Sequence, residues 1–290
     1  MPDEADPRIG NAVSAFWSGR RSQTERQQLT GRVDAGARGA VTGGGHLDAV
    51  RNLLASIFVE AGFPESSIGT TSRIVLPGYY RPSKKWDLTV VLEGKLAAAV
   101  ELKSQVGPSF GNNYNNRCEE AIGNAVDFRR AYDSGAFGDL GPWVGYVMLL
   151  EHAERSTSPV SAGRSEFLID PAFTGASYAG RYVQLCERLV NDGLYDAAWF
   201  ITATTDGVHS EPAESISLAR FTAAVGARAA ALGLAPTMRS RPSRDVGGEL
   251  RQRHRATETS GLLGLTTCRV SRSPTFRLSI RGVLPAKPPR

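Results

Sequence analysis

Two adjacent segments that alternate with period two constrain the fold of this chain more than any other feature. They are WDLTVVL and LAAAVELK, residues 86–92 and 96–103, and Glu93, Gly94 and Lys95 separate them. Period-two alternation is typical of β-strands, and a three-residue connection with a glycine in the left-handed position suits a tight hairpin. The sequence therefore predicts an antiparallel hairpin in which each residue can be assigned to one of two faces.

The length of the predicted turn determines which residues of the hairpin lie opposite each other. With a three-residue loop Leu92 pairs with Leu96, and the same register sets Asp87 directly opposite Glu101. Directly opposed residues share a face with Cβ atoms about 4.5–5.5 Å apart, and Lys103 joins that face because it lies two residues beyond Glu101. The other face is predicted to be wholly apolar, with Trp86, Leu88, Val90, Leu92, Leu96, Ala98, Val100 and Leu102.

The acid pair and the lysine form a candidate catalytic site. Asp87 and Glu101 suit Mg²⁺, which prefers oxygen ligands and keeps waters for contact with a substrate. Such an ion activates water for attack on a phosphodiester, and Lys103 would orient that water or hold the phosphate. An E-x-K motif alone arises readily by chance, and a charged strand face is usually only solvated. The opposed Asp87 favours catalysis, because an acid pair repels itself without a cation.

Two polar segments beside this site suggest contact with nucleic acid. Residues 107–117, GPSFGNNYNNR, are predicted to form a loop, and their candidate DNA contacts are Asn112, Asn113, Asn115, Asn116 and Arg117. Asparagine can pair with adenine and arginine with guanine or phosphate, although asparagine turns and a helix cap explain the same residues equally well. Lys84 and Lys85, in a basic and aromatic cluster, fit either phosphate contacts or an ordinary exposed turn.

The remaining periodic segments place the hairpin in one α/β domain. Helical spacing covers residues 47–61, 115–135, 178–191 and 218–232, and short apolar or β-branched runs predict strands over 72–77, 143–150 and 197–204. The order begins αβββαβ, with three consecutive strands before the second helix. This alternation predicts a single α/β domain over residues 46–232.

The two ends of the chain differ from this domain in composition. Residues 1–45 hold a short amphipathic piece around Phe16 and a glycine-rich stretch, and we expect them to pack on the core. Residues 233–290, with one candidate strand over 276–280, carry 12 basic and 3 acidic side chains, whereas the rest of the chain carries 22 basic and 26 acidic ones. The net charge of +5 therefore comes from a basic tail, either a solvated and disordered segment or a nonspecific DNA-binding one.

Other classes of protein are disfavoured by composition. The three cysteines, Cys118, Cys186 and Cys268, lack C-x-x-C spacing, so neither a disulfide framework nor a cysteine zinc site is expected. The N-terminal MPDEADPR does not resemble a signal peptide, and no apolar run approaches the roughly 18 residues of a membrane helix. We expect a cytoplasmic protein without membrane contact.

Several longer stretches together resemble the XhoI-type restriction endonucleases of the PD-(D/E)XK nuclease superfamily. They are GARGAVTGGG, the run from LPGYYRPSKK to GNNYNNRCEEAIGNAVDF, and PWVGYVMLLE, so the resemblance spans about residues 31–232. It implies a restriction-endonuclease-like αβββαβ core with a mixed sheet flanked by helices. It also implies Mg²⁺-dependent cleavage of double-stranded DNA at CTCGAG, a homodimer, and a cognate DNA methyltransferase completing a restriction-modification system.

The resemblance also assigns roles to single residues. Asp87, Glu101 and Lys103 match the superfamily's acid, acid and lysine positions, with Trp86 where proline is frequent, and Glu60 is a candidate for an additional acid near the metal. The tail has no counterpart in the family, which fits a DNA-binding addition or a shifted reading frame. Two rival functions are a repair or junction-resolving nuclease of the same superfamily and a DNA-binding module without cleavage, against which the complete acid pair and lysine argue.

Overall fold

The computed structural model describes residues 6–29 and 44–237, which belong to one compact unit. Its centre is a six-stranded sheet with the order β1-β4-β5-β6-β7-β8. The strands are β1 (Ile68–Gly69), β4 (Leu88–Leu92), β5 (Lys95–Gln105), β6 (Trp143–Glu151), β7 (Ala197–Ala203) and β8 (His209–Ser210). β5, β6 and β7 run parallel, whereas the other neighbours pair antiparallel. The predicted α/β class with a mixed sheet is confirmed; the expected tail and its strand lie outside the described residues.

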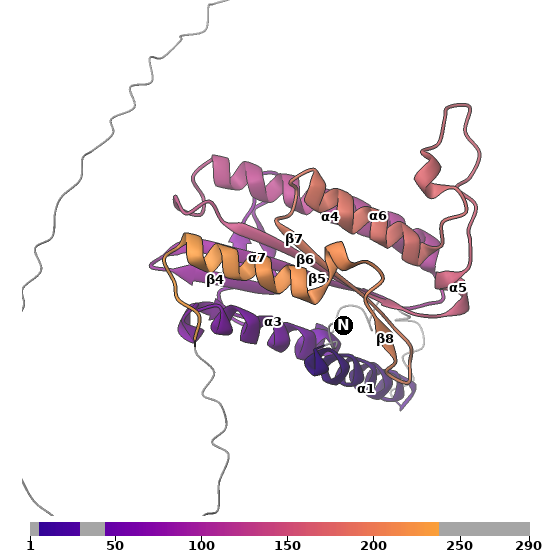
Figure 1. Ribbon diagram of the computed structural model, residues 1–290, viewed down its shortest axis with the longest axis horizontal. Coiled ribbons are helices and arrows are strands. Elements are labelled where there is room, and N and C mark those ends of the chain that lie inside the picture. The colour runs from indigo at the N-terminus through magenta and orange to yellow at the C-terminus, as the bar shows by residue number, and fades with distance from the viewer. Residues whose placement is uncertain (1–5, 30–43, 238–290) are drawn as a thin grey trace, which may run out of the picture. The chain divides into compact units, whose positions relative to one another are not determined.

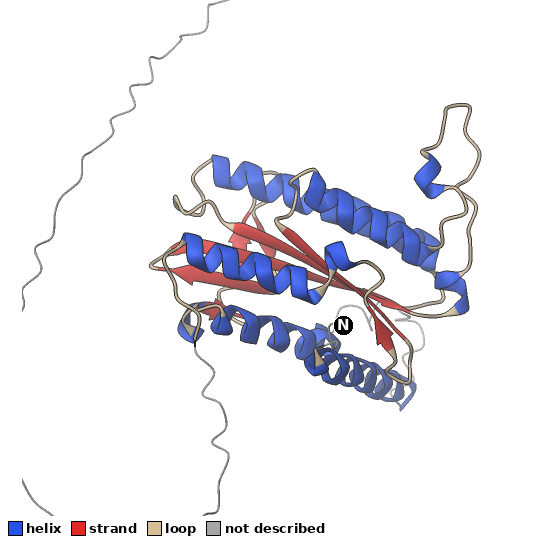
Figure 2. Ribbon diagram, viewed as in Figure 1, coloured by secondary structure: helices blue, strands red, loops and turns tan. Residues whose placement is uncertain are grey.

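Helices cover both faces of the sheet (Figure 1), and the red strands lie between blue helical layers (Figure 2). One layer contains α1 (Pro7–Leu29), α3 (Asp48–Glu60) and α7 (Leu218–Ala231), and the other contains α4 (Phe110–Asp133) and α6 (Tyr178–Asn191). A short helix, α5 (Glu154–Thr157), follows β6. β6 and β7 are buried almost throughout because helices cover them on both sides, as is usual for parallel strands. Within the described residues no helix is long and apolar enough to cross a membrane.

The last helix shows how local sequence sets an element and its packing. Ser217 caps α7, its hydroxyl accepting a hydrogen bond from the backbone N–H of Arg220 at 3.3 Å. The apolar residues of α7 recur at helical spacing and lie on the core. Contacts continue past the helix, because Leu234 packs against the same core and the Thr237 N–H donates to the Glu60 carbonyl at 3.1 Å.

The β4–β5 hairpin has the predicted register near the candidate site but not at its turn. Leu88 pairs with Val100 as predicted, whereas Leu92 pairs with Lys95, so the predicted three-residue loop is wrong. The turn has two residues, Glu93 and Gly94, with φ of 49° and 78°, which matches the twist of the flanking strands. A bulge at Val90/Val91 absorbs the extra residue and restores the register.

The bulge also changes which side chains share a face. Leu96 was predicted on the wholly apolar face, but it lies in the other layer, towards α4, because the register shift turns it over. Trp86 lies there too, since it precedes β4 and its N–H donates to the Ile74 carbonyl at 2.8 Å. The apolar face towards α3 and α7 therefore lacks both residues.

The segment 72–77 is not the first strand of the main sheet as predicted. It contains β2 (Val75–Pro77), which pairs with β3 (Ser83–Lys85) in a separate two-stranded sheet. The strand beside β4 is instead the two-residue β1. A strand of two residues shows no detectable alternation, so it could not be predicted from the sequence.

Candidate active site

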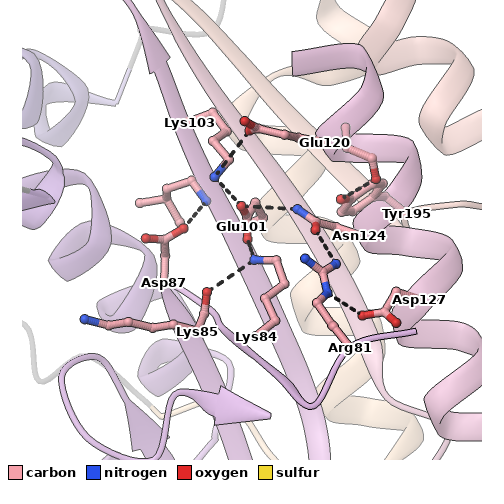
Figure 3. Close-up of polar contacts among 12 residues, drawn as sticks. Arg81, Lys84, Lys85, Asp87, Glu101, Lys103, Glu120, Asn124, Asp127 and Tyr195 are labelled. Carbon is pink, nitrogen blue, oxygen red and sulfur yellow. Dashed lines mark hydrogen bonds and ion pairs between the residues drawn. The ribbon is translucent and has the colours of Figure 1, made fainter. Parts of the chain in front are cut away.

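Glu101 projects from β5 towards α4, and the Asp87 carboxylate lies beside β5 close to it (Figure 3). The Leu88–Val100 pair continues into Asp87, whose N–H donates to the Val100 carbonyl at 3.2 Å. The Leu102 N–H donates to Asp87 Oδ2 at 2.8 Å, which fixes the carboxylate against β5. Asp87 Oδ1 accepts no hydrogen bond from the residues that the structure describes. One oxygen of this carboxylate is therefore held and the other is available to a ligand.

Glu101 is a buried carboxylate whose charge is compensated by two lysines. Its side chain is 1% exposed, Lys103 Nζ contacts Oε1, and Lys84 Nζ contacts Oε2. Lys84 is also the more enclosed lysine, 11% exposed against 24% for Lys103, and its Nζ lies 4.4 Å from the centroid of the Trp86 ring. A buried ion is costly unless it is paired, and the two lysines together stabilise the ionised form of Glu101.

The two acids of this site differ in how readily they ionise. Burial raises the pKa of Asp87, and the charge of Glu101 raises it further. Burial also opposes ionisation of Glu101, but the charges of Lys103 and Lys84 outweigh it and lower the pKa of this carboxyl. For Lys103, burial is outweighed by Glu101, which raises the pKa of the ammonium group. The site therefore combines a firmly ionised Glu101 and Lys103 with an Asp87 that a cation would help to ionise.

Helix α4 closes the site with polar side chains that the sequence did not single out. Asn124 Nδ2 lies 3.5 Å from Glu101 Oε1, and Glu120 lies 3.8 Å from Lys103 Nζ. Asp127, one turn beyond Asn124, accepts from Arg81 Nε at 2.8 Å. Residues 120, 124 and 127 share one face of a helix, and two of them are buried polar residues on an otherwise apolar face. The spacing of these polar residues was the signal in the sequence for their part in the site. It is a weak signal unless it is known that β5, with Glu101, lies opposite.

Comparison with known proteins identifies the family of this chain. The family model described as Restriction endonuclease XhoI matches residues 26–212. The chain belongs to the XhoI restriction endonuclease family. It is therefore a type II restriction enzyme, a site-specific deoxyribonuclease. No solved structure matches the chain significantly.

Individual relatives of this XhoI family member agree with that assignment. The type II restriction enzyme BstVI of Geobacillus stearothermophilus is 40% identical over 205 residues, which cover 67% of this chain and 91% of the relative. The type II restriction enzyme XhoI of Xanthomonas vasicola is 44% identical over 185 residues, 63% of this chain and 74% of the relative. AbrI of Azospirillum brasilense, also a type II restriction enzyme, is 45% identical over 147 residues, half of this chain and 66% of the relative.

The asparagines predicted as DNA contacts lie in a helix and not in the predicted loop. Asn112, Asn115 and Asn116 are exposed and Asn113 is half-buried, all within the first two turns of α4. Phe110 and Tyr114 are buried against Tyr178 of α6, and this packing outweighs the low helix propensity of glycine and asparagine. The four asparagines thus occupy one end of the helix that also carries Asn124.

The other predicted contacts lie at different distances from the acid pair. Lys85 is exposed on β3, whereas Lys84 points into the site. Arg117 pairs with Glu120 at 2.5 Å. Glu60 ends α3 and pairs with Arg8 at 2.8 Å, and none of the contacts that join Asp87, Glu101 and Lys103 includes it.

Proposed function

We propose that this XhoI-family enzyme hydrolyses both strands of duplex DNA at the palindrome CTCGAG, with Asp87, Glu101 and Lys103 as its catalytic residues. The observation that carries the assignment is the convergence of these three side chains in one partly enclosed site. The CTCGAG specificity follows from the resemblance to the family. A repair nuclease would share the acids and the lysine but not this sequence preference.

The donor set of the site fits a divalent cation, which type II restriction enzymes generally need. Asp87 and Glu101 offer carboxylate oxygens, the ligands that Mg²⁺ prefers, and Oδ1 of Asp87 accepts no hydrogen bond from any described residue. The described residues contain no group of three or more His, Cys, Asp or Glu placed to hold a metal ion together. The proposed site is accordingly one with two carboxylates, where bound Mg²⁺ would activate water and neutralise charge on the phosphate.

The lysines of the site can divide two tasks between them. Lys103 is the more exposed of the pair that contacts Glu101, so it can reach a phosphate oxygen or orient the attacking water. Lys84 is enclosed between Glu101 and the Trp86 ring, and we assign it the role of a fixed counter-ion. The hydrogen bond from the Leu102 N–H holds the Asp87 carboxylate beside β5.

Assembly and DNA contact follow from the palindromic target. Two identical strands of a palindrome are matched by two copies of the chain related by a twofold axis, so we propose a homodimer with one site per strand. The proposed DNA-contacting side chains are Lys85, Asn112, Asn113, Asn115, Asn116 and Arg117. Lys84, the other lysine predicted as a DNA contact, pairs with Glu101 and keeps the counter-ion role assigned above. A cognate methyltransferase would protect host DNA.

Within the chain, we propose residues 46–232 as the nuclease domain, preceded by an associated segment 1–45 and followed by a basic tail.

The test uses two plasmids that differ only in one CTCGAG site. The enzyme is incubated with each plasmid in Mg²⁺ and in a chelator, and the product ends are sequenced. We expect one double-strand cut at CTCGAG that requires the metal. Equal cutting of both plasmids would indicate a structure-specific nuclease, and specific binding without cutting would indicate a DNA-binding module; either result contradicts the proposal.

A further inference from the structure

A buried carboxylate of α4 fastens the turn between β2 and β3 to that helix. Asp127, 4% exposed, accepts from the backbone N–H groups of Tyr79 and Tyr80 at 2.9 and 2.7 Å. Its second oxygen accepts from Arg81 Nε at 2.8 Å. Gly78 allows the close approach, since a Cβ there would lie 2.8 Å from Asp127 Oδ2. The turn is therefore held by backbone as well as side-chain donors.

Arg81 extends this attachment towards the acid pair. While its Nε binds Asp127, its Nη2 donates to Asn124 Oδ1 at 2.7 Å. Accepting from Arg81 through Oδ1 fixes the orientation of the Asn124 amide, so that its Nδ2 faces Glu101 Oε1 at 3.5 Å. Figure 3 shows Arg81, Asn124 and Glu101 in this order between the turn and β5.

The role of Asn124 differs from that of the lysines on the same carboxylate. Lys103 must leave Glu101, at least in part, if it is to contact a phosphate or the attacking water. Asn124 is neutral, 6% exposed and clamped by Arg81, so it stays in place when a lysine moves. A buried amide on an apolar helix face is costly unless its hydrogen bonds are made, and here both of its polar ends have partners.

We infer that Asn124 is a positioning residue for Glu101, and that Arg81 and Asp127 hold it in register with the β2–β3 turn. The inference rests on the proposed cleavage function of the acid pair. The turn it includes is exposed at Tyr79 and Tyr80, 48% and 68%, beside the exposed Lys85, a combination that suits contact with the DNA backbone. The β2–β3 turn, which would meet DNA, is thus joined to Glu101 through Arg81 and Asn124.

A double-mutant cycle tests this connection. Arg81→Ala, Asn124→Ala and the double variant are compared with the wild type in single-turnover cleavage of a CTCGAG duplex at saturating enzyme. We expect each single variant to cut about tenfold more slowly and the double variant to be no slower than either, since both remove the same connection. Binding of the duplex without Mg²⁺ should change less than about twofold for Asn124→Ala, because the residue acts on the rate and not on affinity.

The control is Ile122→Ala, an exposed site on the same helix with a side chain 45% exposed. It should cut like the wild type, and adding it to Arg81→Ala should change nothing. Melting curves verify that each variant is folded at the assay temperature. If Asn124→Ala does not fold, Asn124→Asp replaces it, because it keeps an acceptor for Arg81 and loses the donor to Glu101; it should also cut slowly.

The outcomes separate this inference from the proposed function. Cleavage at the wild-type rate by a folded Asn124 variant, or a double variant that loses the product of the two single effects, overturns the positioning role. Glu101→Ala is measured beside them. If it still cuts at the wild-type rate, or if the wild-type chain cuts no DNA, the proposed function itself is wrong and the inference with it.

Discussion

The two faces of the β4–β5 hairpin are built from alternating residues of the same strands, yet one is apolar and the other carries charged groups. Towards α3 and α7, Leu88, Val90 and Val100 are fully buried in an apolar layer. Towards α4, the equally buried Glu101 is surrounded by lysines and an amide. One face contributes free energy of folding through apolar burial, and the other contains charges that lower stability unless they are paired.

This difference makes the consequences of mutation separable along the strand. Removal of apolar atoms from one face should reduce stability and leave the chemistry of folded molecules unchanged. Removal of a charged group from the other should abolish chemistry. The predictions below test that separation.

The largest effect is expected for Glu101→Ala. Because Glu101 is a proposed metal ligand, its loss should slow cleavage about 1000-fold or more, roughly 4 kcal/mol of transition-state stabilisation. Binding to the CTCGAG duplex should persist, since the proposed base contacts lie on α4. Single-turnover cleavage and equilibrium binding provide the two measurements.

Glu101→Ala also leaves Lys84 and Lys103 without their common partner, so Glu101→Gln is needed as a variant that keeps the shape of the side chain. The exposed Glu166→Ala is the matched control and should cut normally. Cleavage by both Glu101 variants at the control's rate would contradict the catalytic assignment.

The opposite face is tested with Leu54→Ala. Leu54 of α3 is fully buried in the apolar layer, and its truncation should lower the free energy of unfolding by about 2–5 kcal/mol. Denaturant unfolding measures this loss, and the cleavage rate per folded molecule should stay within about twofold of the wild type, because Leu54 packs in the apolar layer and not among the charged groups of the site.

Leu168→Ala serves as its control. This leucine is 93% exposed, so the change in unfolding free energy should be under about 0.5 kcal/mol. A large loss of catalytic rate in folded Leu54→Ala would mean that the two faces are not independent.

The same comparison shows what the sequence alone could predict. Alternation and register placed Asp87 opposite Glu101, and the pairs nearest the site have the predicted register. The turn and the bulge each shifted the register by one residue and cancelled, so the result depended on a feature that the pattern did not reveal. The predicted face of Leu96 is wrong for this reason, because the bulge places it in the other layer.

Contacts between segments far apart in the sequence could not be predicted, for a different reason. Asn124 and Asp127 lie in a helix that was predicted, but their partners Arg81 and Glu101 come from segments far away in the sequence. Spacing along α4 shows that two polar residues share a buried face, not which carboxylate that face meets. Tertiary packing of Phe110 likewise extended this helix into the segment predicted as a loop.

A smaller effect is expected from the asparagines at the start of α4, which lie on neither face of the hairpin. We expect that at least one alanine substitution among Asn112, Asn113, Asn115 and Asn116 weakens specific binding by about 1–3 kcal/mol and barely changes nonspecific affinity. Competition between cognate and altered duplexes measures both. Asn191→Ala, at the exposed end of α6, is the control. Unchanged discrimination in all four variants would place base reading elsewhere.

The smallest effect on the folded enzyme is expected from removal of the C-terminal segment. The truncated chain should end at Thr237, because Leu234 packs on the apolar layer and the Thr237 N–H donates to the Glu60 carbonyl. Residues 238–290 carry 12 basic and 3 acidic side chains, which favour binding to phosphates without base reading. Cleavage at CTCGAG and unfolding free energy should therefore stay unchanged, whereas nonspecific DNA affinity and its dependence on salt both fall. Titrations of a duplex without CTCGAG at several salt concentrations measure the difference. If the truncated chain instead loses stability or sequence specificity, residues 238–290 belong to the nuclease domain, and they contribute to folding or recognition in addition to the two faces of the hairpin.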